Sequence, residues 1–173
     1  LEAMERAEVP AIVFSSSAAV YGTPDVERVR ARVEELAERS DLIKASDEDL
    51  LWLYPGSTLQ ESARAWLRKG AGMVVVTRGE MGPWAVTEAT GPVGIEVPAR
   101  RTDVVDTVGA GDSFMGGLED ALWSEDLVGA DRREALRAVD TATLERIVRH
   151  AAAIADITVS RDGANPPTRD ELP

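Results

Sequence analysis

The hydrophobic pattern of the chain divides it into short strands that alternate with amphipathic helices. Continuous apolar runs at 9–14 and 73–77 are typical of strands that are covered on both faces of a sheet. Within 24–36, valine and leucine recur every three or four positions, which places them along one side of a helix. Strands that alternate with helices in this way predict an α/β fold.

Helix caps mark the next elements. Ser46 followed by Asp49, and Thr58 followed by Glu61, have the spacing of a capping box, although an aspartate replaces the usual glutamate in the first pair. Gly70 is placed to end the second of these two helices. The other predicted elements are strands at 41–44, 84–87 and 95–98 and helices at 131–139 and 143–157.

The segment 104–118 organises the rest of the chain. Two valines at 104–105 read as the end of a buried strand, a glycine-rich turn follows at 109–111, and a small-residue apolar run then predicts a helix. The first amides of a helix have no internal partners and the helix dipole favours negative charge, so this arrangement is an anion site. Asp112 places a carboxylate beside this anion site. The carboxylate is easiest to explain as a base that accepts a proton from an attacking hydroxyl. The alternative is a plain helix cap with glycines used for packing.

Length and composition restrict the class of protein. The 173 residues, 44% hydrophobic and 29% charged, suffice for one α/β core, and we expect a single domain over 1–173. A net charge of -12 argues against a nucleic-acid or anionic-membrane surface. Without cysteine there is no disulfide, thiolate zinc site or cysteine nucleophile. No apolar run approaches membrane-spanning length and no signal peptide opens the chain, so we expect a cytoplasmic location.

The run Asp106-Thr-Val-Gly-Ala-Gly-Asp112, followed by Ser-Phe-Met-Gly-Gly117, resembles the C-terminal signature of the PfkB carbohydrate kinases, which have the ribokinase-like fold. The resemblance implies a three-layer α/β/α, Rossmann-like domain whose sheet is mostly parallel with an antiparallel hairpin. It also implies that an N-terminal part and the lid are missing, because kinases of this family are longer and carry the signature late. The likeness runs from about residue 41 to the C-terminus, and 44–56 looks most like the fructokinase branch.

The activity that this resemblance implies is transfer of the γ-phosphoryl group of ATP to a sugar hydroxyl. Asp112 would be the base, and the amides of Gly109, Ala110 and Gly111 would stabilise charge on the transferring group. The family has an Asn-x-x-Glu element that helps to hold hydrated Mg²⁺, and this chain offers Ser46-x-x-Asp49 at the same place. Those two residues serve either the metal or only the start of a helix.

Further site residues follow from the resemblance alone. The segment 77–82 is similar to a Thr-x-Gly-x-x-Gly loop beside the nucleotide, although a hairpin turn would need the same glycines. The tail at 158–168 resembles a loop whose carbonyls bind a monovalent cation, for which K⁺ is the candidate, although a proline-terminated surface loop would have the same residues. The implied nucleotide contacts are Thr77, Gly79, Gly82, Thr107 and Asn165. His150, the only histidine, has no nucleophile partner motif and is read as a surface residue or a wall of the nucleotide pocket, not as a catalyst. The implied cation-site residues are Asp106, Thr158, Arg161 and Gly163.

The chain departs from the family pattern after its first predicted strand. The family often has Asp-Pro-Asn-x-Arg there, whereas this chain has Ser-Ser-Ser-Ala-Ala at 15–19. Two rivals to a fructokinase-like enzyme therefore stay open: a non-catalytic remnant or ATP-binding module, and a kinase for a keto-deoxy sugar acid or a nucleoside. A sheet cut before 9–14 would expose a strand edge, so we also expect self-association, up to a homo-oligomer, and little activity from this chain alone.

Overall fold

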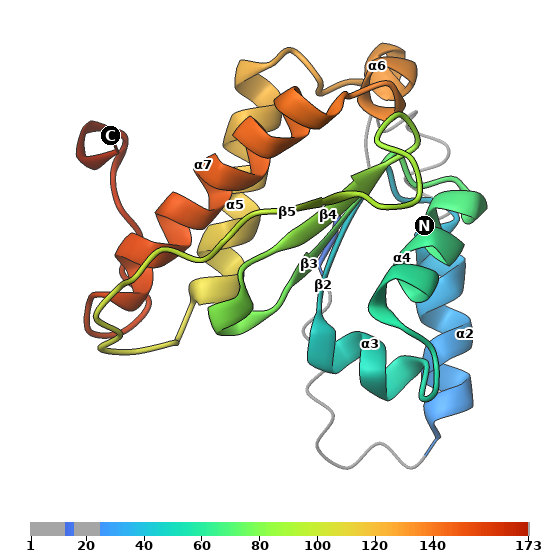
Figure 1. Cartoon of the computed structure of the whole chain (residues 1–173), viewed down its shortest axis with the longest axis horizontal. Helices are drawn as coiled ribbons and strands as arrows, with labels where there is room; N and C mark the ends of the chain where they lie inside the picture. The colour runs from blue at the N-terminus through green and yellow to red at the C-terminus, as the bar shows by residue number, and fades with distance from the viewer. Residues whose placement is uncertain (1–12, 16–24, 173) are drawn as a thin grey trace.

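The structure is a computed structural model, and it describes residues 13–15 and 25–172. Figure 1 shows a central sheet with helices on both sides. The strands are β1 (Val13–Ser15), β2 (Leu42–Ser46), β3 (Met73–Thr77), β4 (Trp84–Thr87) and β5 (Ile95–Glu96). The helices are α2 (Val26–Ala37), α3 (Asp47–Leu53), α4 (Leu59–Lys69), α5 (Ala110–Ser124), α6 (Arg133–Arg137) and α7 (Thr141–Val159), with short 3-10 turns η1 (Gly79–Met81), η2 (Ala130–Arg132) and η3 (Arg169–Glu171).

The sheet follows the order of the sequence, β1-β2-β3-β4-β5. The first three strands are parallel, and the register places Ser46 at the end of β2 beside Thr77 at the end of β3. β4 and β5 run antiparallel. The predicted α/β architecture with an antiparallel hairpin is confirmed, and half of the strand pairings among the described residues are parallel. Of the strand expected at 9–14, only the part from Val13 lies within the described residues, and the 16–19 part of the departing loop lies outside them.

Alternate residues of the strands serve two separate cores, because successive side chains of a strand point to opposite faces. Leu42 and Val75 pack against the side chains of α5 and α7. Ile43 and Val74 pack on the other face, against α2, α3 and α4. All four side chains are almost fully buried. The sheet is therefore the middle layer of three, as Figure 1 shows.

Both capping boxes are present. The Ser46 hydroxyl accepts from the Asp49 amide at 3.1 Å, and the Asp49 carboxylate accepts from the Ser46 amide at 3.1 Å, which starts α3. Thr58 and Glu61 start α4 in the same reciprocal way, and Gly70 ends it with a φ of 128°. These contacts confirm the two predicted helix starts and the predicted stop.

Replacing Thr58 by alanine is expected to lower the free energy of unfolding by about 1 kcal/mol, the usual cost of losing a side-chain cap. The Thr58 hydroxyl accepts from the Glu61 amide at 3.2 Å and donates to its carboxylate at 2.8 Å, and alanine removes both bonds. Urea unfolding followed by circular dichroism measures the change. Ser57→Ala is the control, because Ser57 is exposed and lies just before the cap. Equal effects of the two substitutions would contradict the role of the cap.

The prediction of a buried strand before the signature helix is wrong. Val104 and Val105 do not end a buried strand: their side chains are 61% and 62% exposed, and the chain between β5 and α5 is irregular. Instead of joining a strand, the amides of Val105 and Asp106 both donate to the carbonyl of Val159, at the end of α7. Irregular backbone thus replaces the predicted strand before the turn at 109–111.

The later helices are close to their predicted positions. The helix expected at 131–139 is a 3-10 turn followed by the short α6, and the helix expected at 143–157 is longer, because Asp140 caps α7 through the Thr143 amide at 2.8 Å. α5 and α7 pack closely side by side and cover one face of the sheet. Among the residues that the structure describes, none of the helices has the length and apolar character needed to cross a membrane.

Candidate active site

The N-terminus of α5 faces the carboxyl ends of the parallel strands β2 and β3, which is where ligands bind in open α/β sheets. Gly109 is its N-cap, in the left-handed region with a φ of 77°, and it makes no side-chain cap bond. A β-carbon at Gly109 would lie 2.7 Å from that of Ala164 in the C-terminal tail. Glycine is therefore required here by both the turn and the tail.

The amides of this turn differ in what they contact. The Ala110 amide donates to the Thr107 carbonyl at 3.2 Å, so that donor of the expected anion site is already used within the turn. Within the part of the chain that the structure describes, no backbone acceptor pairs with the amides of Gly111 or Asp112. The first regular bond of the helix comes from the Ser113 amide to the Gly109 carbonyl at 2.9 Å. The Gly109 amide likewise has no acceptor among the described residues, so three donors at the helix start remain for an anion.

Asp112 lies in the first turn of α5 with its side chain exposed. A carboxylate at this end of a helix is stabilised by the helix dipole. It does not act as the N-cap, because Gly109 holds that position. The simple capping role considered for Asp112 therefore does not apply, and the residue is exposed to solvent.

Lys44 of β2 completes the site, and sequence reasoning missed it. Its side chain is only 4% exposed. A β-carbon at Gly111 would lie 2.9 Å from Nζ, so the ammonium is packed against the backbone of α5. Burial lowers the pKa of Lys44, while the nearby carboxylates of Asp49 and Asp112 raise it. The signal in the sequence was Lys44 itself, a charged residue inside the apolar run 42–45, which otherwise reads as a buried strand.

Ser46 and Asp49, the expected magnesium residues, are brought to the same place as Lys44. Asp49 is 4% exposed, and its carboxylate accepts from the Ser46 amide as part of the helix cap. The two readings of this pair, a helix start and a metal contact, are therefore compatible in space. No cluster of three or more histidine or acidic residues suited to a metal ion occurs within residues 13–15 and 25–172. A Mg²⁺ ion carried by a nucleotide needs only one or two protein carboxylates, and Asp49 and Asp112, which both interact with the charge of Lys44, would supply them.

The loop at 77–82 lies at the end of β3, next to the end of β2. Thr77 donates from its hydroxyl to the Ala45 carbonyl at 3.4 Å, Gly79 begins η1, and Gly82 follows it. Arg78 holds the loop closed, because its Nε donates to the Gly82 carbonyl at 2.8 Å. The three residues expected beside the nucleotide thus share the carboxyl edge of the sheet with Ser46.

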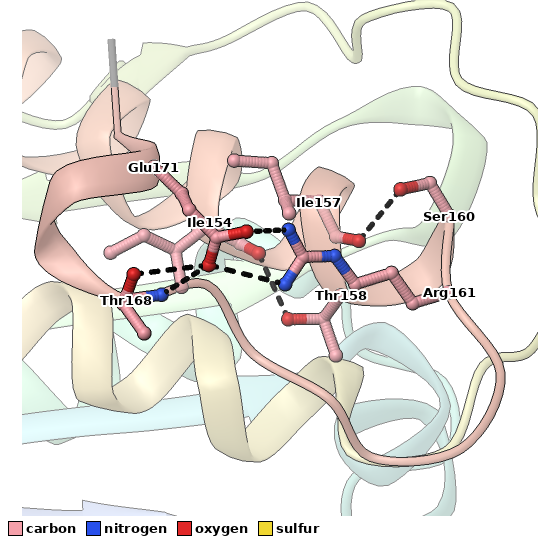
Figure 2. Close-up of polar contacts among 7 residues, drawn as sticks. All are labelled: Ile154, Ile157, Thr158, Ser160, Arg161, Thr168 and Glu171. Atoms are coloured by element: carbon pink, nitrogen blue, oxygen red, sulfur yellow. Dashed lines mark hydrogen bonds and ion pairs between the residues drawn. The ribbon is translucent and has the colours of Figure 1, made fainter.

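The C-terminal tail is joined to the signature segment by Asp106. Its carboxylate accepts from the Val108 amide at 3.0 Å and from the Gly163 amide at 3.1 Å. Thr158, on the last turn of α7, is fully buried and donates to the Ile154 carbonyl at 2.9 Å (Figure 2). The segments expected to supply carbonyls for a monovalent cation are therefore adjacent, at Asp106 and Gly163.

Arg161 closes the tail on itself. Its guanidinium forms an ion pair with Glu171 at 2.6 Å, and the same carboxylate accepts from the amide of Thr168 at 2.8 Å, as Figure 2 shows. The side chain of Arg161 is therefore engaged in the fold of the tail. Only its backbone is left to serve the expected cation site.

This arrangement predicts an unusual titration of Glu171. Arg161, and then the amide and hydroxyl of Thr168, lower the pKa of the Glu171 carboxyl to about 2, from an ordinary 4.5. A lowered pKa means that the ion pair stabilises the tail fully above pH 4.5, and that this contribution is lost as the pH falls from 4.5 towards about 2. Carbon-detected NMR titration of Glu171 measures it. In Arg161→Gln the midpoint should move up towards 4.5, and a wild-type midpoint already there would contradict the contact.

His150, another residue expected beside the nucleotide, lies away from Asp112. His150 of α7 bonds Asp120 of α5 through Nε2 at 2.8 Å, and Asp120 also pairs with Arg169 of η3. Asp120 lies eight residues along α5 from Asp112, which is about 12 Å of helix. His150 thus joins two helices and the tail and does not meet the signature aspartate. Thr107 and Asn165 are both exposed, and in the sequence Thr107 lies two residues before Gly109 and Asn165 directly after Ala164, which a β-carbon at Gly109 would meet.

Comparison with known proteins shows the family of the chain. Residues 11–171 match the family described as pfkB family carbohydrate kinase, and the chain belongs to that family. Fructokinase of Rhizobium leguminosarum bv. trifolii is 40% identical over 98 residues, 57% of this chain and 29% of that protein. Probable fructokinase-4 of Arabidopsis thaliana is 31% identical over 152 residues, 86% of this chain and 43% of that protein. The chain therefore spans less than half the length of these relatives.

Solved structures confirm the ribokinase-like fold. Fructokinase with bound ATP from Xylella fastidiosa superposes with a TM-score of 0.78 at 24% identity, covering 94% of this chain and 50% of that one. Aminoimidazole riboside kinase from Salmonella enterica gives a TM-score of 0.70 at 24% identity, covering 98% of this chain and 52% of that one. At these identities the likeness shows the fold and not the substrate.

Proposed function

We propose that the protein that carries this segment transfers the γ-phosphoryl group of ATP to a hydroxyl of a sugar, as a fructokinase-like member of its family. The observation that carries the proposal is the exposed carboxylate of Asp112 in the first turn of α5, beside the amides of Gly111 and Asp112. A base and an anion site are thus within one helical turn. That is the pair of groups that phosphoryl transfer to a hydroxyl needs.

Each group has a distinct role in this reaction. Asp112 accepts the proton of the sugar hydroxyl as that oxygen attacks the γ-phosphorus, so the base must be open to the substrate, and Asp112 is exposed. The amides at the start of α5 donate to the phosphoryl oxygens as charge develops on them. Mg²⁺ bound with ATP would offset the charge of the phosphates, and Asp49 would reach it through water.

The loop at 77–82 and the exposed Thr107 and Asn165 are proposed to contact the nucleotide. Thr77 and Gly82 support this because they lie at the same sheet edge as Ser46. A K⁺ ion is proposed between the Asp106 and Gly163 segments, which the Asp106 carboxylate already holds together. It would fix the start of α5 and stay outside the chemistry.

Fructose is the substrate that we propose, because the relatives named above are fructokinases. Two alternatives remain as outcomes of the test: another acceptor, such as a nucleoside or a 2-keto-3-deoxy sugar acid, and a protein that binds ATP without transferring it. Neither is favoured by a particular contact in the described residues.

The test is a panel of acceptors assayed with MgATP and the protein that carries this segment. Fructose, ribose, a nucleoside and 2-keto-3-deoxygluconate are compared by kcat/KM from coupled detection of ADP. We expect fructose to have the highest value. A higher value for another acceptor would overturn the substrate assignment, and ATP binding without turnover on any of them would overturn the enzymatic function.

A further inference from the structure

Lys44 is placed on the α5 side of the sheet by the alternation of β2. Leu42, two residues before it, packs into the core formed with α5 and α7, and the side chain of Lys44 points to the same face. It is buried to the same degree as its apolar neighbours, with 4% of it exposed. Burying an ammonium is costly unless charged or hydrogen-bonding partners surround it. The groups around the Lys44 ammonium must therefore stabilise its charge.

Two kinds of group meet the Lys44 ammonium. The carboxylates of Asp49 and Asp112 lie close enough to interact with its charge. On the helix side, Nζ is packed against Gly111, where a β-carbon would lie 2.9 Å away. A side chain at position 111 would therefore displace the ammonium of Lys44. The ammonium and the start of α5 share one small space.

The ammonium and the Gly111 amide are both hydrogen-bond donors, so they cannot bond each other. An acceptor placed between them would satisfy both, and an anion would satisfy them best because one is a full positive charge at a helix N-terminus. The adjacent Asp112 indicates which anion binds between Lys44 and the Gly111 amide. If Asp112 is the base for an oxygen that attacks the γ-phosphorus, the acceptor beside it is the terminal phosphate and not an inner one.

We propose that Lys44 is a substrate-binding residue that donates to the terminal phosphate of ATP together with the Gly111 amide, and that Asp49 and Asp112 hold it before the nucleotide arrives. This proposal rests on the phosphotransfer function proposed above. It adds a lysine from β2 to a site otherwise built from backbone donors. The alternative is a structural ion-pair cluster that supports the fold and never meets a ligand.

The test compares the affinities of MgATP and MgADP by isothermal titration calorimetry for Lys44→Met and Lys44→Arg. Lys69→Met is the matched control, because Lys44 and Lys69 are the two lysines of the sequence and Lys69 pairs with Glu38 on the other side of the sheet. We expect Lys44→Met to weaken MgATP about tenfold or more, the effect of one hydrogen bond to a charged group. MgADP affinity should be nearly unchanged, Lys44→Arg intermediate, and Lys69→Met like wild type.

The outcomes separate the two proposals. Equal losses for MgATP and MgADP, or no loss, would overturn the role of Lys44 and leave the kinase function standing. A wild-type protein that binds neither nucleotide would overturn both. Because Lys44→Met leaves two carboxylates without their ammonium and is at risk of misfolding, a second measurement uses the wild type. With lysine labelled at Cε, MgATP should shift the NMR signal of Lys44 and not that of Lys69, and an unmoved Lys44 signal would overturn the proposal.

Discussion

Replacing Asp112 by asparagine is expected to lower kcat for sugar phosphorylation by on the order of 10²–10⁴, the usual contribution of a general base. Asparagine keeps the size of the side chain and loses the group that accepts the proton. Asp112 is exposed and does not cap α5, so the fold should be unaffected. ATP affinity should be preserved or slightly improved, because a carboxylate that repels phosphate is removed while Lys44 stays.

Glu119→Gln is the matched control for this substitution. Glu119 is an exposed acid on the same helix, away from its N-terminus. Its neutralisation should leave kcat unchanged, which separates the base from a general effect of charge on α5. Turnover close to wild type in Asp112→Asn would contradict the assignment of the base.

Replacing Gly111 by valine is expected to lower kcat/KM by on the order of 10², comparable to the loss of one anion-binding donor. The new side chain would meet Lys44 Nζ, since a β-carbon alone would lie 2.9 Å from it. It would also crowd the approach of phosphate to the Gly111 amide. Gly111 is not among the described residues with a positive φ, so the backbone itself tolerates a side chain and stability should change little.

Gly116→Val tests whether the loss of kcat/KM is specific to position 111. Gly116 lies in the same helix, and a β-carbon there would meet nothing within 4 Å. We expect it to keep wild-type kinetics and a similar thermal stability. If calorimetry shows wild-type ATP affinity in a folded Gly111→Val protein, the anion site does not lie at this turn.

The fold was largely predictable because its signals are local. The Thr58 and Glu61 pair specifies a helix start within four residues, and the apolar run at 73–77 needs only burial on both faces to be read as a strand. Gly70 specifies the end of α4 through its own backbone, with a φ of 128°. Such features depend little on the distant parts of the chain.

Features that depend on distant contacts were missed or misplaced. The valines at 104–105 have the composition of a strand, but their backbone bonds to the end of α7 and their side chains are exposed. Lys44 acquires its importance from Gly111, which is 67 positions away in the sequence and adjacent in space. No local pattern contains this information. The Ala110 amide is a different case: its acceptor, the Thr107 carbonyl, is only three residues away, and the bond depends on the conformation of the turn.

A crystal structure with MgATP bound decides whether the terminal phosphate lies at the N-terminus of α5. We expect this phosphate to accept from the Gly111 amide and from Lys44 Nζ, with the Asp112 carboxylate facing the γ-phosphorus from the acceptor side. A nucleotide bound elsewhere, or one bound here with its phosphates turned away from Gly111 and Lys44, would contradict it.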